Sequence, residues 1–220
     1  MAHNTARHDN ETRTRVLKAA ARLFAERGFN HVSVRDICQE AGANVASVNY
    51  HFGDKLGLYR ELIGTMAEGM NDAKASAFAA AEGRPSEDQL RAYIHRFLHQ
   101  LLDTNPGEES YLDKIVAREM TEPTAALDLI IAKGIKPASD RLSRLVSEFL
   151  GLPTDHSHVL LSMSAIQGLC LWYRSSRTVA ERMFPEIQFT PERIEYLAEF
   201  IADFSLAGLR ARMKKTRGKE

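Results

Sequence analysis

The segment from residue 44 to residue 51, which reads NVASVNYH, gathers side chains suited to contacting a nucleic acid. An asparagine amide can pair with the N6 and N7 edge of adenine, and small apolar side chains can touch a thymine methyl group. Hydroxyl and imidazole groups can donate hydrogen bonds to phosphate oxygens. The candidate contact residues in this segment are Asn44, Val45, Ala46, Ser47, Asn49, Tyr50 and His51.

Two basic residues extend this candidate surface. Arg35 falls at the start of an expected helix, where it can contact a phosphate or a guanine edge or else remain a solvated arginine beside Asp36. Lys55 falls in the first turn of another expected helix, where its positive charge opposes the helix dipole. A phosphate partner would offset that cost, and a solvated lysine is the alternative.

The elements that must position these residues are two short helices joined by a tight turn. Ser33 can cap the first helix, and apolar residues at i, i+3, i+4 and i+7 from Val34 give it one buried face. Gly42 can end that helix, because glycine adopts positive φ without steric cost, and Asn44 can cap the second. With a further helix expected over residues 12–27, this pattern indicates a helix-turn-helix, whose second helix enters the major groove of DNA.

Four runs of residues at fixed spacing lie within and beside this motif: Gly28-Phe29, Ser33–Ile37, Ala41–Ala43 and Tyr50–Lys55. Together they resemble the DNA-binding domain of the tetracycline-repressor (TetR) family. The resemblance implies an all-helical, homodimeric, one-component transcription regulator that binds palindromic double-stranded DNA. It also implies a DNA-binding head over residues 1–55 and a larger helical body over residues 56–220 for dimerisation and for a small-molecule effector.

The resemblance also assigns roles residue by residue. By match to the motif, the DNA-facing positions are Arg35, Val45, Ala46, Asn49, Tyr50, His51 and Lys55. The family often has tyrosine at the position of Asn49, whereas the aromatic side chain here is Tyr50. We therefore expect Asn49 to read a base where the usual tyrosine contacts the backbone.

The remaining sequence is expected to form the helical body. The string REMTEPT at residues 118–124 resembles the CecR-like subgroup of these regulators, which implies sensing of an antibiotic or another aromatic or amphipathic toxicant. Arg118 and Glu119 are expected to form an intramolecular ion pair on a helix. In the last helix an apolar stripe, which includes Ile201 and Phe204, fits either a dimer interface or a helix buried within one subunit.

Apolar positions with embedded polar groups are typical of ligand pockets. On this basis the candidate ligand-binding residues are Phe97, His99, Tyr111, Met163, Gln167, Trp172 and Tyr173. For each of them packing in the core is the alternative, and Trp172 equally fits the dimer interface. His95 and His99 are four residues apart on an expected helix, but no metal site is predicted, because no third ligand follows at a zinc-enzyme spacing.

Composition excludes several other classes of protein. No apolar run reaches the length of about 18 residues that a membrane span needs, and the polar N-terminus does not resemble a secretion signal. Cys38 and Cys170 fit reduced, buried thiols of a cytoplasmic protein. Basic residues outnumber acidic ones by nine to six in residues 1–60, whereas residues 61–209 hold 22 acidic against 14 basic residues. This asymmetry fits contact with a polyanion at one end only.

Catalytic and cofactor-binding motifs are absent from the sequence, so no enzyme activity and no cofactor are predicted. The leading hypothesis is a repressor that a small aromatic or amphipathic molecule releases from a palindromic operator. The alternative is a DNA-binding regulator that has no small-molecule ligand and acts through protein partners.

Overall fold

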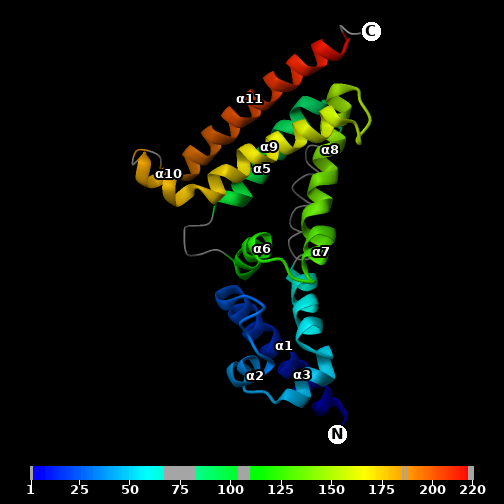
Figure 1. Ribbon diagram of the computed structural model, residues 1–220, viewed down its shortest axis with the longest axis vertical. Helices are drawn as coiled ribbons and strands as arrows, with labels where there is room; N and C mark the ends of the chain where they lie inside the picture. The colour runs from blue at the N-terminus through cyan, green and yellow to red at the C-terminus, as the bar shows by residue number, and fades with distance from the viewer. Residues whose placement is uncertain (1, 67–82, 104–109, 185, 187, 218–220) are drawn as a thin grey trace. The chain divides into compact units, whose positions relative to one another are not determined.

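The computed structural model describes residues 2–66, 83–103, 110–184, 186 and 188–217, and of residues 2–8 and 215–217 only the helical backbone. Helices account for the regular structure of these residues, and no strand occurs among them, as Figure 1 shows. The all-helical fold expected from the sequence is confirmed. The chain divides into two compact units, residues 1–72 with 109–136 and residues 73–108 with 137–220.

The first unit holds the helix-turn-helix. Its helices are α1 (Ala2–Arg27), α2 (Val34–Ala41), α3 (Val45–Phe52), a helix over residues 55–66, α6 (Tyr111–Thr121), α7 (Leu127–Ile130) and the π-helix η1 (Ile131–Ile135). Phe24, Ile37, Val48 and Ile63, each with 0% of its surface exposed, lie in its core. The sequence predicted that the helix after residue 54 continues to about residue 81, but residues 67–82 lie outside the described part of the chain.

The first unit takes in α6 because this helix packs against α1. By packing, the unit therefore extends beyond residue 55 and includes a segment that is distant in sequence. The functional division into a DNA-binding head over residues 1–55 and a ligand-binding body over residues 56–220 stays a prediction.

The second unit consists of four long helices, α5 (Ser86–Leu102), α8 (Lys136–Leu150), α9 (Ser157–Ser175) and α11 (Pro191–Arg217), and the short helix α10 (Arg177–Met183), among its described residues. In this unit α5, α9 and α11 lie side by side (Figure 1). Leu98, Leu142, Cys170 and Ala198 are fully buried where these helices meet. The π-helix η1 ends two residues before Pro137, which offers no N–H to continue the α-helical pattern.

Candidate nucleic-acid interface

Local hydrogen bonds fix the start and the end of α2. The Ser33 hydroxyl accepts from the Asp36 amide at 3.2 Å, while an Asp36 carboxylate oxygen accepts from the Ser33 amide at 2.8 Å. Hydrogen bonds from the Ser33 side chain and backbone lower the pKa of Asp36, so this capping box is intact at neutral pH. At the other end Gly42 adopts φ 59°, and the chain turns directly into α3.

The cap of α3 uses two of the predicted contact residues. The Asn44 side-chain oxygen accepts from the Ser47 amide at 2.7 Å and from the Ser47 hydroxyl at 3.0 Å. This cap commits the Asn44 oxygen to the protein, so any contact from Asn44 to DNA would come from its amide NH₂ group.

The exposed face of α3 carries four predicted contact residues. Val48 and Phe52 are buried and hold the helix against α1 and α2. Val45, Ala46, Asn49 and Tyr50 are exposed, and Tyr50 has 78% of its surface accessible. Arg35 on α2 is exposed as well. Helical periodicity therefore separates this face cleanly from the core.

His51 and Lys55 instead bind within the unit. His51 Nε2 lies 3.1 Å from Asp9 Oδ1 on α1, and only 8% of the histidine side chain is exposed. Lys55 Nζ donates to the carbonyl oxygens of Phe29 and Val32 at 3.0 and 3.1 Å, and it lies 4.2 Å from the centre of the Phe29 ring. Their role as phosphate contacts stays a prediction. In the structure His51 joins α3 to α1, and Lys55 holds the loop before α2.

The neighbours of Arg118 and Glu119 differ from the expected ion pair. The Arg118 guanidinium donates to the carbonyl oxygens of Ala25 at 3.2 Å and Glu26 at 2.6 Å, and it thereby caps the end of α1. The Glu119 carboxylate, whose residue is 2% exposed, accepts from the Tyr59 hydroxyl at 2.9 Å. It also accepts from the hydroxyl and the amide of Thr124 at 2.7 and 2.8 Å. The expected pair was wrong, because each side chain satisfies a separate set of backbone or hydroxyl groups.

The spacing of residues along α6 indicates that the Glu119 carboxylate is buried. Glu119 follows Ile115 by four residues and Leu112 by seven, so it falls on the apolar face of α6. The hydrogen bond from Tyr59 joins this carboxylate to the helix over residues 55–66. Burial together with Glu119 raises the pKa of the Tyr59 phenol. The Tyr59 hydroxyl therefore remains a donor throughout the neutral range.

The seven predicted ligand-binding residues have different surroundings in the structure. Phe97, Met163 and Tyr173 pack against the core of the second unit, and Trp172 is half exposed beside Tyr173. Gln167 donates to the Ser139 hydroxyl at 3.1 Å, and His99 contacts the carboxylates of Asp103, at the end of α5, and Glu195 of α11. Tyr111 lies in the first unit. The ligand role of all seven stays a prediction.

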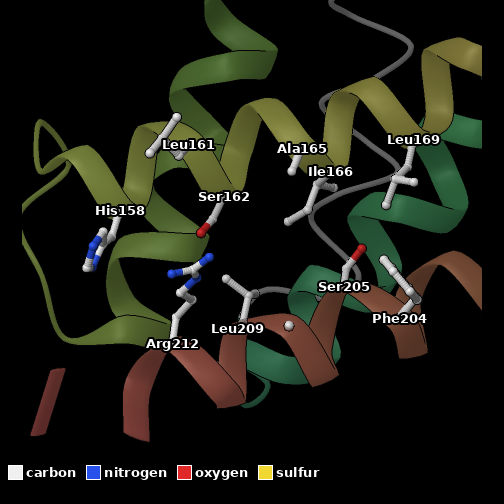
Figure 2. A pocket seen from close by; sticks show the side chains of 11 residues that line it. His158, Leu161, Ser162, Ala165, Ile166, Leu169, Phe204, Ser205, Leu209 and Arg212 are labelled. Atoms are coloured by element: carbon white, nitrogen blue, oxygen red, sulfur yellow. The ribbon is translucent and has the colours of Figure 1, made fainter. Parts of the chain in front are cut away.

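A half-open groove of about 280 Å³ lies between α9 and α11. Figure 2 shows His158, Ser162 and Arg212 at one end and the apolar Leu169 and Phe204 at the other. None of the seven predicted ligand-binding residues lines this groove.

Among the residues whose placement is known, no group of three or more histidine, cysteine or acidic side chains is arranged to hold a metal ion. Within the same residues, no helix combines the length and the apolar character of a membrane span.

The fold and the exposed face of α3 define the class of protein: an all-helical protein with an N-terminal helix-turn-helix for DNA. Comparison with known families agrees. Residues 16–62 match the family described as bacterial regulatory proteins, tetR family, and residues 86–209 match the C-terminal domain of the HTH-type transcriptional dual regulator CecR. The second match alone spans more than half of the chain. The chain therefore belongs to the TetR family of transcriptional regulators, with a CecR-type C-terminal domain.

Individual relatives resemble the chain over nearly its whole length. The HTH-type transcriptional dual regulator CecR of Shigella flexneri is 25% identical over 211 residues, which cover 92% of this chain and 94% of CecR. The HTH-type transcriptional repressor NicS of Pseudomonas putida is 24% identical over 209 residues, or 93% and 95% of the two chains. The fatty acid degradation regulator FadR of Bacillus halodurans has the same fold, with a TM-score of 0.61 at 18% identity over 90% of this chain and 96% of that one. Proteins of this family bind DNA and act as dimers, and they are regulators rather than enzymes.

Proposed function

We propose that the protein is a ligand-responsive repressor that binds a palindromic operator as a homodimer. The observation that carries the proposal is the face of α3 formed by Val45, Ala46, Asn49 and Tyr50, which is exposed while the opposite face of the helix is buried. Two such helices related by a two-fold axis would enter successive major grooves of DNA, roughly 34–36 Å or a multiple of that distance apart.

The side chains of this face suggest a division of work. Asn49 has the amide that pairs with adenine, and Val45 and Ala46 are suited to thymine methyl groups. Tyr50 and Arg35 have donors for phosphate oxygens, which fix the register of the protein on DNA without reading sequence. His51 and Lys55 act from behind this face, by holding α3 and the loop before α2 in place.

The dimer would form through α9 and α11. Tyr196, Phe200 and Phe204 repeat every four residues along α11, and each has more than half of its surface exposed. Large apolar side chains gathered in one row mark an interaction surface. The groove between α9 and α11 borders Phe204, so it can accept an aromatic side chain of a second copy. A Phe204→Asp substitution should yield monomers in sedimentation velocity, and a dimer that survives it would exclude this face.

The proposed regulation requires an effector that prefers one state. A small aromatic or amphipathic molecule releases DNA only if it binds the DNA-incompetent state more tightly. To shift the protein from 99:1 in favour of the DNA-competent state to 1:99, the effector must bind the DNA-incompetent state roughly 10⁴-fold more tightly. Repression is supported by the relationship to NicS, whose description is that of a repressor.

Selection of bound DNA from a random library, followed by sequencing, tests the DNA-binding part of the proposal. Enrichment of a palindrome with half-sites spaced by a whole helical turn is expected, and enrichment of no sequence would refute it. A thermal-shift screen of aromatic and amphipathic compounds tests the effector. A compound that stabilises the protein and weakens operator binding supports a ligand-responsive repressor, whereas a screen without any such compound favours action through protein partners.

A further inference from the structure

Two histidines of α5 lie against carboxylates of α11 in the second unit. His95 Nδ1 lies 3.2 Å from Glu195 Oε1, and His95 Nε2 lies 2.9 Å from Glu199 Oε2. His99 Nε2 lies 2.9 Å from Glu195 Oε2. The Glu195 carboxylate therefore spans both imidazoles, with one oxygen for each. We call these four residues the histidine–carboxylate cluster.

Charged pairs continue the same row on both sides. His99 Nδ1 lies 3.1 Å from an oxygen of Asp103, the residue that caps the C-terminus of α5. In the other direction Arg91 forms ion pairs with Glu199 and with Asp203, the second at 2.8 Å. Beyond them Arg210 and Glu87 are paired at 2.6 Å. The partners on α11 rise in residue number as those on α5 fall, so the contacts join two antiparallel helices along most of α5.

The geometry of the two imidazoles matches their charged form. Both ring nitrogens of His95 face carboxylate oxygens, and so do both ring nitrogens of His99. A neutral imidazole has one N–H and can donate to only one of its two carboxylates, whereas an imidazolium donates to both. Each histidine that loses its proton therefore leaves one carboxylate contact without a hydrogen.

We propose that the histidine–carboxylate cluster is a pH-dependent latch, in which protonated His99 donates to Glu195 and Asp103 and fastens α5 to α11, and which loosens when His99 is neutral. Histidine is the side chain that ordinarily changes charge between pH 5 and pH 8, so the latch responds to mild acidification. The helix that it fastens carries the exposed aromatic row of Tyr196, Phe200 and Phe204.

The charges around the cluster favour this response. Burial lowers the pKa of His99, but hydrogen bonds to Glu195 and Asp103 outweigh it, and the net pKa is raised above 6.5. The hydrogen bond from His99 lowers the pKa of Glu195 below 4.5. Two positive groups lie at the end of α5, where the guanidinium groups of Arg174 of α9 and Arg177 of α10 donate to the carbonyl oxygens of residues 101 and 102.

The signs of these shifts define the pH window. A raised histidine pKa contributes stability that is fully present below 6.5 and is lost as the pH rises through the folded-state pKa. A lowered glutamate pKa contributes stability that is present above 4.5 and is lost as the pH falls through the folded-state pKa. The latch is therefore strongest in mildly acidic solution and weakest above neutral pH.

A metal ion is the competing occupant, because two pairs of ligands at i and i+4 spacing face each other. The described residues hold no group of three or more such side chains arranged for a metal, and each contact in the cluster joins one imidazole nitrogen to one carboxylate oxygen at hydrogen-bonding distance. This one-to-one pairing fits a shared proton better than a shared cation.

Thermal unfolding of the full-length protein between pH 6 and pH 8, with a chelator present, tests the latch. The melting midpoint of the wild type should fall by about 2–6 °C more over this range than that of a His95→Gln/His99→Gln variant, because the variant has no imidazole to lose its proton and its contact with a carboxylate. Glu195→Gln keeps both imidazoles and should remove most of the same pH dependence. The matched control is His31→Gln, since His31 is an exposed histidine of the first unit.

Parallel pH profiles for the wild type and both cluster variants would overturn the proposal. Should the double variant fail to fold, the titration of the His99 ring resonances in the wild type and in Glu195→Gln decides the question, with a lower pKa of His99 expected in the variant. Stabilisation of the wild type by zinc ion in chelator-free buffer, absent from the double variant, would show a metal site instead and also overturn the proton latch.

Discussion

The Tyr59→Phe substitution tests whether the polar cluster of α6 supports the helix-turn-helix. It deletes one hydroxyl, which donates to Glu119 at 2.9 Å, and leaves a ring that packs 4.7 Å from Phe24 and 4.8 Å from Phe29 between ring centres. Tyr59 and Glu119 are each 2% exposed, so water cannot replace the lost hydrogen bond without a rearrangement. The variant isolates a single polar contact in an otherwise unchanged core.

The structure sets the size of the effect. A hydrogen bond to a charged group contributes about 1.5–3 kcal/mol, so Tyr59→Phe should lower the free energy of unfolding by that amount. Glu119→Ala removes the acceptor for Tyr59 and for both donors of Thr124, and it should cost about 3–5 kcal/mol. In the double variant no Tyr59 hydroxyl is left without an acceptor. The free energy of unfolding should therefore fall by about 1–2 kcal/mol less than the sum of the two single-variant losses.

Urea denaturation followed by circular dichroism at neutral pH provides the measurement. The control is Tyr50→Phe, which removes the hydroxyl of a tyrosine that is 78% exposed in the same unit and should stay within about 0.5 kcal/mol of the wild type. If Tyr59→Phe unfolds at the same urea concentration as this control, or if the double variant equals the sum of the single variants, the cluster does not carry the stability assigned to it.

Four further predictions concern DNA binding and the thiols. Asn49→Ala should relax base preference at one operator position by about 1–3 kcal/mol in competition assays with altered operators, and a uniform loss across operators would contradict base reading. Tyr50→Ala should weaken binding to all operator sequences alike, because a contact with phosphate carries no sequence information, and a loss confined to one base position would exclude that contact. Lys55→Met should lower the free energy of unfolding by about 1.5–3 kcal/mol, because the Lys55 ammonium donates to two backbone carbonyls, and an unchanged urea midpoint would leave the lysine free for DNA. Burial raises the pKa of the Cys170 thiol to about 12, so at pH 8 Cys170 should react with a thiol reagent only as the protein unfolds, and rapid labelling of the native protein would show an open core.

Much of the helix-turn-helix could be predicted because its signals are local. Ser33 with Asp36, Gly42 and Asn44 with Ser47 act within four residues of one another, and each occupies the cap or turn that its side chain favours. The exposed face of α3 followed from helical periodicity around Val48. These interactions require no knowledge of the rest of the chain.

Residues with long-range partners could not be assigned in the same way. His51 has the chemistry of a phosphate donor, yet it faces Asp9, which is 42 positions away along the chain. Arg118 meets the end of α1, and its adjacency to Glu119 in sequence suggested an ion pair that the fold replaces with separate partners. The same limit applies to His95 and His99, whose carboxylates lie on α11.

The sequence by itself determined the fold class, the helix-turn-helix and the family, because helix caps, a glycine at positive φ and an apolar stripe are written in short windows of residues. Only the tertiary structure decided which polar side chains remain available at the surface. It turned Lys55 inward onto the loop before α2, buried Glu119 against Tyr59 and brought the histidines of α5 against α11. The physical reason is that a donor or a charge takes its role from the partner that the fold supplies, and those partners are distant in the chain.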